Sequence, residues 1–137
     1  TTTAQLKKYR ANQCELEELF AIKNKIFEFH KENIISGLKI AITIKGLGTA
    51  GASGLLAVIF PNYFGTVDQF AVKSLLKIDK LPERTSILAM WPDELKIKDA
   101  AILINIMKNK ARELNRQFST SYWNPRKIDM ILWSIER

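Results

Sequence analysis

Cysteine and histidine are almost absent from this sequence, and their scarcity removes several classes of reaction. Cys14 is the one cysteine among 137 residues, so neither an internal disulfide nor an iron–sulfur cluster on four cysteines can form. The one histidine, His30, lies in a segment rich in Lys and Glu, which disfavours a Ser-His-Asp catalytic arrangement. No zinc-ligand spacing occurs. We therefore expect no metal and no cofactor, and a lone cysteine suits the reducing cytoplasm.

Long hydrophobic runs are also lacking. The longest one covers residues 55–60, far short of the roughly 20 residues that span a bilayer, so we expect no membrane partner. Hydrophobic residues make up 47% of the chain and charged residues 26%, which predicts one folded domain over residues 1–137. The sequence begins at Thr1 rather than Met, so an upstream segment could be missing and could complete a base pocket. The oligomeric state stays open.

Positive charge is in excess. The formal net charge is +7, with a sequence pI of about 9.6. A surplus of Lys and Arg attracts polyanions, chiefly nucleic acid. Lys108, Arg112 and Arg116 recur every four residues and could extend such a surface, although a row of this kind is more often the solvated face of a helix.

The hydrophobic periodicity predicts an all-α domain of about six helices. In residues 33–44 a period of two also permits a strand. Thr66, with Gln69 three residues later, predicts a capping box, and Asn124-Pro125 predicts a capped helix start. Prolines mark a loop near residues 81–94. The expected helices cover residues 4–31 (with a possible break at Asn12), 33–44, 50–60, 66–78, 98–118 and a segment from 124 onward.

A glycine turn between two apolar segments, at about residues 34–60, is the most informative feature. In Gly46-Leu47-Gly48 the glycines permit a tight turn, and the first amides of the next helix have no acceptor within that helix. Such amides, with the helix dipole behind them, suit a phosphate. We therefore predict a helix-hairpin-helix that contacts the DNA backbone, through residues Lys45, Gly46, Leu47, Gly48, Thr49 and Ala50.

The hairpin resembles that of the helix-hairpin-helix DNA glycosylase superfamily. The pattern of two glycines flanking a hydrophobic residue is matched by Gly46, Leu47 and Gly48, and its small residues by Gly51 and Ala52. The family places a catalytic Asp, in a Val-Asp pair opening a helix, about eighteen residues beyond a fixed hairpin position. Val67-Asp68 stands at that distance from Ala50. The resemblance covers about a third of the chain and implies a helix before the turn, with Asp68 as catalytic residue.

A looser likeness extends to uncharacterised bacterial proteins with the same hairpin. It rests on Pro61-Asn62-Tyr63 before the Asp and on the ending Arg126-Lys127-Ile128-Asp129-Met130-Ile131-Leu132-Trp133. The chain departs from the glycosylases in three ways. Lys45 replaces the hairpin proline, Ala50 stands where bifunctional members keep a Schiff-base lysine, and the chain is short for the family.

Three functions follow from these features. If the protein is an enzyme, it is a monofunctional DNA N-glycosylase of base-excision repair. There Asp68 would activate water or stabilise the oxocarbenium-like sugar of a flipped nucleotide. The alternatives are a non-catalytic DNA-binding module, in which Asp68 only favours a helix start, and a helical protein-interaction domain. Among the tryptophans we expect Trp133 in the core and Trp91 exposed.

Overall fold

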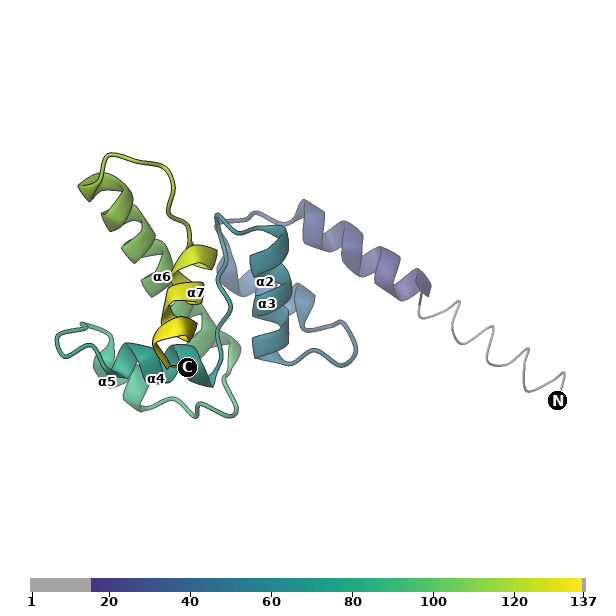
Figure 1. Cartoon of the computed structure of the whole chain (residues 1–137). Helices are drawn as coiled ribbons and strands as arrows, with labels where there is room; N and C mark the ends of the chain where they lie inside the picture. Colours follow the sequence, from purple (N-terminus) through teal and green to yellow (C-terminus); the bar gives the residue numbers. More distant parts are fainter. Residues whose placement is uncertain (1–15, 137) are drawn as a thin grey trace, which may run out of the picture.

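The computed structural model describes residues 16–136, which form helices joined by turns, with no strand in that range. This confirms the all-α class. Residues 16–28 are helical and precede six further helices (Figure 1): α2 (Ile34–Ala41), α3 (Thr49–Ile59), α4 (Gln69–Leu76), α5 (Arg84–Leu88), α6 (Ile97–Gln117) and α7 (Pro125–Glu136).

The long helix α6 is the element that joins the two sides of the body. It contacts α2, α3 and α7, and α7 in turn packs on α4 and also contacts α3. The short α5 lies against α4. The helix of residues 16–28 extends away from the body (Figure 1). The pair α2 and α3, joined by the glycine turn, is therefore attached to the rest of the domain through α6 and, at α3, also through α7.

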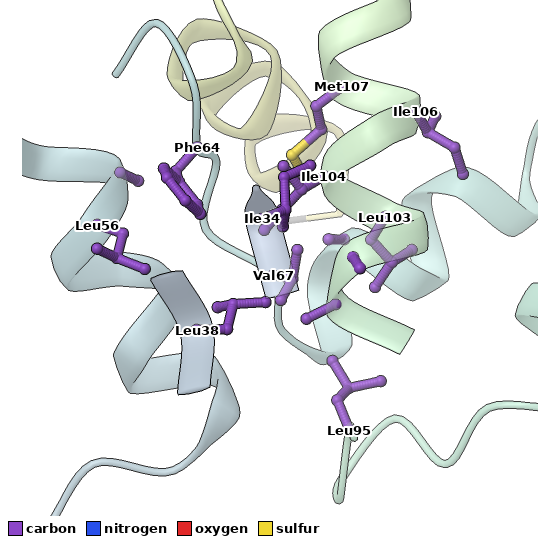
Figure 2. Packing of buried hydrophobic residues seen from close by; sticks show 14 of the residues in the cluster. Ile34, Leu38, Leu56, Phe64, Val67, Leu95, Leu103, Ile104, Ile106 and Met107 are labelled. Carbon is purple, nitrogen blue, oxygen red and sulfur yellow. The ribbon is translucent and has the colours of Figure 1, made fainter. Parts of the chain in front are cut away.

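The core lies where α2, α3, α6 and the segment before α4 meet (Figure 2). Burying one large aliphatic or aromatic side chain stabilises a fold by about 1.5–3 kcal/mol. Gly65 marks a close approach, because an added Cβ would lie 2.9 Å from the carbonyl oxygen of Pro125. The largest fully buried side chains include Leu38, Leu56, Phe64, Val67, Leu103, Ile104 and Met107.

Several predicted features are confirmed, although α2 ends at Ala41 rather than at residue 44. The ambiguous segment after His30 is helical as α2, since Ile34, Leu38 and Ala41 form one buried helical face. Asn124 caps α7, accepting a hydrogen bond from the Lys127 amide at 2.9 Å. The expected helix over residues 4–31 is helical in residues 16–28, whereas Asn12 and Cys14 lie outside the described residues.

Two details of the prediction are wrong. α4 begins later than expected, with Asp68 rather than Thr66 as its N-cap, because the Thr66 amide donates instead to Asp129 of α7. The expected loop over residues 81–94 contains the short α5. In the first case a long-range contact replaced the local capping box, and a local sequence pattern cannot reveal such a contact.

Candidate nucleic-acid interface

The connection between α2 and α3 is a tight turn that depends on Gly46. The Leu47 amide donates to the Ile44 carbonyl at 3.1 Å, which makes Lys45 and Gly46 the two central residues. Gly46 has a φ of +93°, a backbone conformation that L side chains rarely adopt. A turn of type II requires a positive φ at this second central position and favours proline at the first. Lys45 thus occupies the place where the glycosylase pattern has proline.

The N-terminus of α3 carries the amides that the sequence predicted for phosphate contact. Gly48 is the N-cap, with extended backbone and no side-chain hydrogen bond to the helix. The first amide bonded to the N-cap carbonyl is that of Ala52, at 2.9 Å. The amides of Thr49, Ala50 and Gly51 therefore precede the first intrahelical acceptor and are available to an anion.

Leu47 holds this start of α3 in place. A Cβ added to Gly51 would lie 3.0 Å from the Leu47 Cδ2 atom, so the absence of a side chain at Gly51 lets Leu47 lie directly on the first turn. Lys45 and Gly48 are both exposed, whereas Leu47 is half-buried. Among the predicted contact residues, Leu47 packs on the first turn of α3 and is half-buried, as is Thr49. The exposed ones are the other four, Lys45, Gly46, Gly48 and Ala50.

Asp68 caps the helix that follows. Its Oδ1 accepts a hydrogen bond from the Ala71 amide at 3.0 Å, and its side chain is partly exposed. The second carboxylate oxygen is not used in this bond. Asp68 therefore has a structural role in α4 whether or not it also acts on a substrate.

A groove of about 760 Å³ brings the hairpin and Asp68 together. One wall is the start of α3, at Gly48, Thr49 and Ala50, and Asp68 lies on another part of the lining. The loop before α6 completes the groove and adds two carboxylates, of Asp93 and Glu94, beside Lys96. The predicted residues Lys45, Gly46 and Leu47 are not part of its lining.

A second cavity, of about 580 Å³, is also lined by Asp68. Its lining also includes Arg126, Asp129 and Trp133 of α7. Asp68 is the residue common to the linings of the groove and of this cavity. The cavity is therefore lined by two carboxylates, of Asp68 and Asp129, by the Arg126 guanidinium and by the Trp133 indole ring.

Asp129 is the group lining this cavity whose pKa is shifted. Its side chain is buried, and burial raises the pKa of the carboxyl above its ordinary value, against the opposing effects of the Thr66 amide and Arg126. Oδ1 pairs with Arg126 Nη1 at 2.7 Å, and Oδ2 accepts from the Thr66 amide at 2.6 Å. In the sequence, Arg126 and Asp129 belong only to the terminal motif and have no predicted role. Their spacing of three on one helix was the signal that could have paired them.

Other side chains are placed differently from expectation. Trp133 lines the cavity with 43% of its surface exposed instead of packing in the core, whereas Trp91 is exposed as predicted. Lys108 is buried and pairs with Glu32 at 2.9 Å, so it is not part of an exposed basic row with Arg112 and Arg116. This pair lowers the pKa of Glu32, chiefly through the hydrogen bond from Lys108.

Comparison with known proteins adds no relative. No protein-family model, no curated protein and no solved structure matches this chain. The likeness to helix-hairpin-helix glycosylases therefore rests on the hairpin and the Val67-Asp68 pair alone. Within residues 16–136, no helix is long and apolar enough to cross a membrane, and no group of three or more acidic or histidine side chains is arranged to hold a metal ion.

Proposed function

We propose that this chain is a DNA-binding helix-hairpin-helix domain that holds a backbone phosphate at the N-terminus of α3. The observation that carries the proposal is the glycine-capped start of α3, whose first amides precede any intrahelical acceptor and whose N-cap, Gly48, is exposed. Phosphate contacts of this type position a protein on duplex DNA without reading its sequence. The net charge of +7 favours such a partner.

The charges around the hairpin indicate where the DNA strand would lie. The carboxylates of Asp68, Asp93 and Glu94 line the groove and would repel a phosphate inside it. Lys45 stands on the turn itself, outside the groove lining, and is exposed. We therefore place the phosphate over the rim formed by Lys45, Gly48 and Thr49, with the acidic groove facing the sugar and base.

A catalytic role for Asp68 is the second part of the proposal. Its location between groove and cavity suits a nucleotide rotated out of the duplex, with the sugar beside Asp68 and the base in the cavity. The unused carboxylate oxygen would then activate water or stabilise the oxocarbenium-like sugar while the base leaves. This is the chemistry of a monofunctional DNA N-glycosylase. If Asp68 only caps α4, the domain is a non-catalytic DNA-binding module.

The experiment that tests DNA binding is a titration of the protein against labelled duplexes, one intact and one with a stable abasic-site analogue, at several salt concentrations. We expect salt-dependent binding to both and tighter binding to the abasic duplex. Equal binding to both duplexes would leave a backbone-holding module without a base-excision role. Absence of binding to either would refute the proposal.

Catalysis has its own test, with the Asp68→Asn variant and a panel of duplexes that each contain one damaged base. Asparagine can keep the capping bond to the Ala71 amide, so the variant should stay folded and keep its affinity for DNA. We expect base release by the wild-type protein and its loss in the variant. Equal release by both proteins would exclude Asp68 as the catalytic residue.

A protein-interaction domain is the second candidate, and a specific surface favours it. The helix of residues 16–28 exposes four large hydrophobic side chains, Leu16, Leu19, Phe20 and Phe27. Contiguous exposed hydrophobic groups mark surfaces that bind other proteins. A chain that shows no affinity for DNA at physiological salt would leave this function as the better supported one.

A further inference from the structure

We propose that the Arg126–Asp129 pair of α7 is a positioning device that fixes the segment Thr66–Asp68 and thereby aims the Asp68 carboxylate. The inference rests on the proposed function, because Asp68 matters for activity only if the domain acts on DNA. It assigns roles to two residues to which the hairpin pattern gives none. Both lie on α7, about sixty residues from Asp68 along the chain.

Thr66, Arg126 and Asp129 are each hydrogen-bonded to the other two. Asp129 Oδ2 accepts from the Thr66 backbone amide at 2.6 Å, and Arg126 Nη1 reaches the Thr66 hydroxyl at 3.4 Å. The same Nη1 pairs with Asp129 Oδ1 at 2.7 Å. Thr66 is therefore held by its backbone and by its side chain, from two residues of one helix turn.

The next residue is fixed from the opposite side. The Val67 amide donates to Ser53 Oγ of α3 at 3.0 Å, and both residues are fully buried. Asp68 then caps α4 through the Ala71 amide. Three consecutive residues are thus bound to three helices, α7, α3 and α4, and the orientation of Asp68 follows from the first two attachments.

Stability alone does not explain a charged pair at this position. The Asp129 side chain is 5% exposed and that of Arg126 is 35% exposed, and an ion pair with one buried partner seldom stabilises a fold more than apolar side chains of the same volume would. Hydrogen bonds are directional, however, and a carboxylate with both oxygens bonded allows Thr66 one position only. The pair also lines the cavity beside Asp68. A positioning role accounts for both the charge and the location.

The test replaces Asp129 with alanine and follows the backbone amide of Ala71 by nuclear magnetic resonance and hydrogen exchange. If the pair aims Asp68, loss of Asp129 weakens the capping bond, so the Ala71 resonance moves and its exchange becomes faster. The preference for the abasic duplex is then lost, while affinity for intact duplex is retained at the hairpin. If excision is detected, its single-turnover rate falls by up to about a hundredfold, the cost of an ångström-scale misplacement.

A matched control is the exposed pair Lys110–Glu113, which has the same spacing of three on α6 and a distance of 3.5 Å. Glu113→Ala should leave the Ala71 amide and both duplex affinities unchanged. If Asp129→Ala does not fold, Arg126→Gln provides the second variant. It keeps the Asp129 bond to the Thr66 amide, and we expect the same changes in smaller degree.

The outcomes separate the two proposals. An Ala71 amide that is unchanged in folded Asp129→Ala overturns the positioning role, whatever the protein does with DNA. A wild-type protein that binds no DNA refutes the proposed function, while the amide measurement still decides whether the pair fixes Asp68. Loss of all DNA binding in a folded Asp129→Ala protein would also contradict the inference, because the residues proposed to contact the phosphate, Lys45, Gly48 and Thr49, do not lie on α7.

Discussion

Replacing each hairpin glycine with alanine separates the contribution of the turn to stability from its proposed contact with DNA. Gly46 has a φ of +93°, and no atom lies within 4 Å of an added Cβ at either Gly46 or Gly48. Gly48 has a φ of −88°, which alanine adopts without strain. The two substitutions therefore add the same methyl group to open space, and they differ in backbone strain.

The expected magnitudes follow from that difference. Alanine in the left-handed region costs about 1–2 kcal/mol, so Gly46→Ala should lower the melting temperature by roughly 3–8 °C. Gly48→Ala exchanges one N-cap residue for a poorer one and should cost less than about 1 kcal/mol. For DNA affinity the expected order is the reverse. Gly48→Ala should weaken binding more than Gly46→Ala does, because a methyl group at residue 48 stands beside the amides that would hold a phosphate.

The assay is thermal unfolding of both variants, followed by titration with intact duplex under conditions where both are folded. We expect Gly46→Ala to be the less stable protein and Gly48→Ala to be the weaker DNA binder. Equal loss of stability in the two variants would refute the argument from φ. Unchanged affinity in Gly48→Ala would refute the placement of a phosphate at the start of α3.

Three further predictions concern the interior. Ser53→Ala leaves the buried Val67 amide without its acceptor and should cost about 1–3 kcal/mol in chemical denaturation; a cost near zero would contradict this. Glu32→Gln leaves the buried Lys108 ammonium without its charged partner, so it should lower the melting temperature more than Lys108→Met does. A larger decrease for Lys108→Met would contradict this account of the ion pair. The raised pKa of Asp129 means that the folded state binds more protons than the unfolded state above pH 3.8. The unfolding free energy should therefore fall as the pH rises from 3.8 through the folded pKa, and Asp129→Asn should lack this slope in melting curves. The same slope in both proteins would assign it to another group.

The helices were predictable because their signals are local. The stripe of Leu103, Met107 and Ala111 sets the buried face of α6, and the glycine turn sets the junction of α2 and α3. The Asn124-Pro125 pair sets the start of α7 through a bond between residues three apart. Each of these features depends on neighbours within one or two helical turns.

The site was only partly predictable because its remaining contacts are long-range. Thr66 looks like a helix cap in sequence, but its amide bonds to Asp129, 63 residues away. Lys108 has the spacing of a solvated face, yet it meets Glu32 from across the domain. Trp133 follows the apolar pattern of α7 but faces a cavity. In each case the side chain's environment is set by a helix that packs from elsewhere in the chain.

The Gly48→Asp substitution tests the central claim most directly. An aspartate at the N-cap can accept the free amides of α3 from within the chain, so it should leave stability unchanged or raise it by a few tenths of a kcal/mol. Occupied amides and a new negative charge would together exclude a phosphate. Asn33→Asp is the matched control, since Asn33 caps the far end of α2 with its Oδ1 3.0 Å from the Ser36 amide. We predict a loss of duplex affinity of about tenfold or more for Gly48→Asp and little change for Asn33→Asp. Equal affinities in the two folded variants would contradict the account.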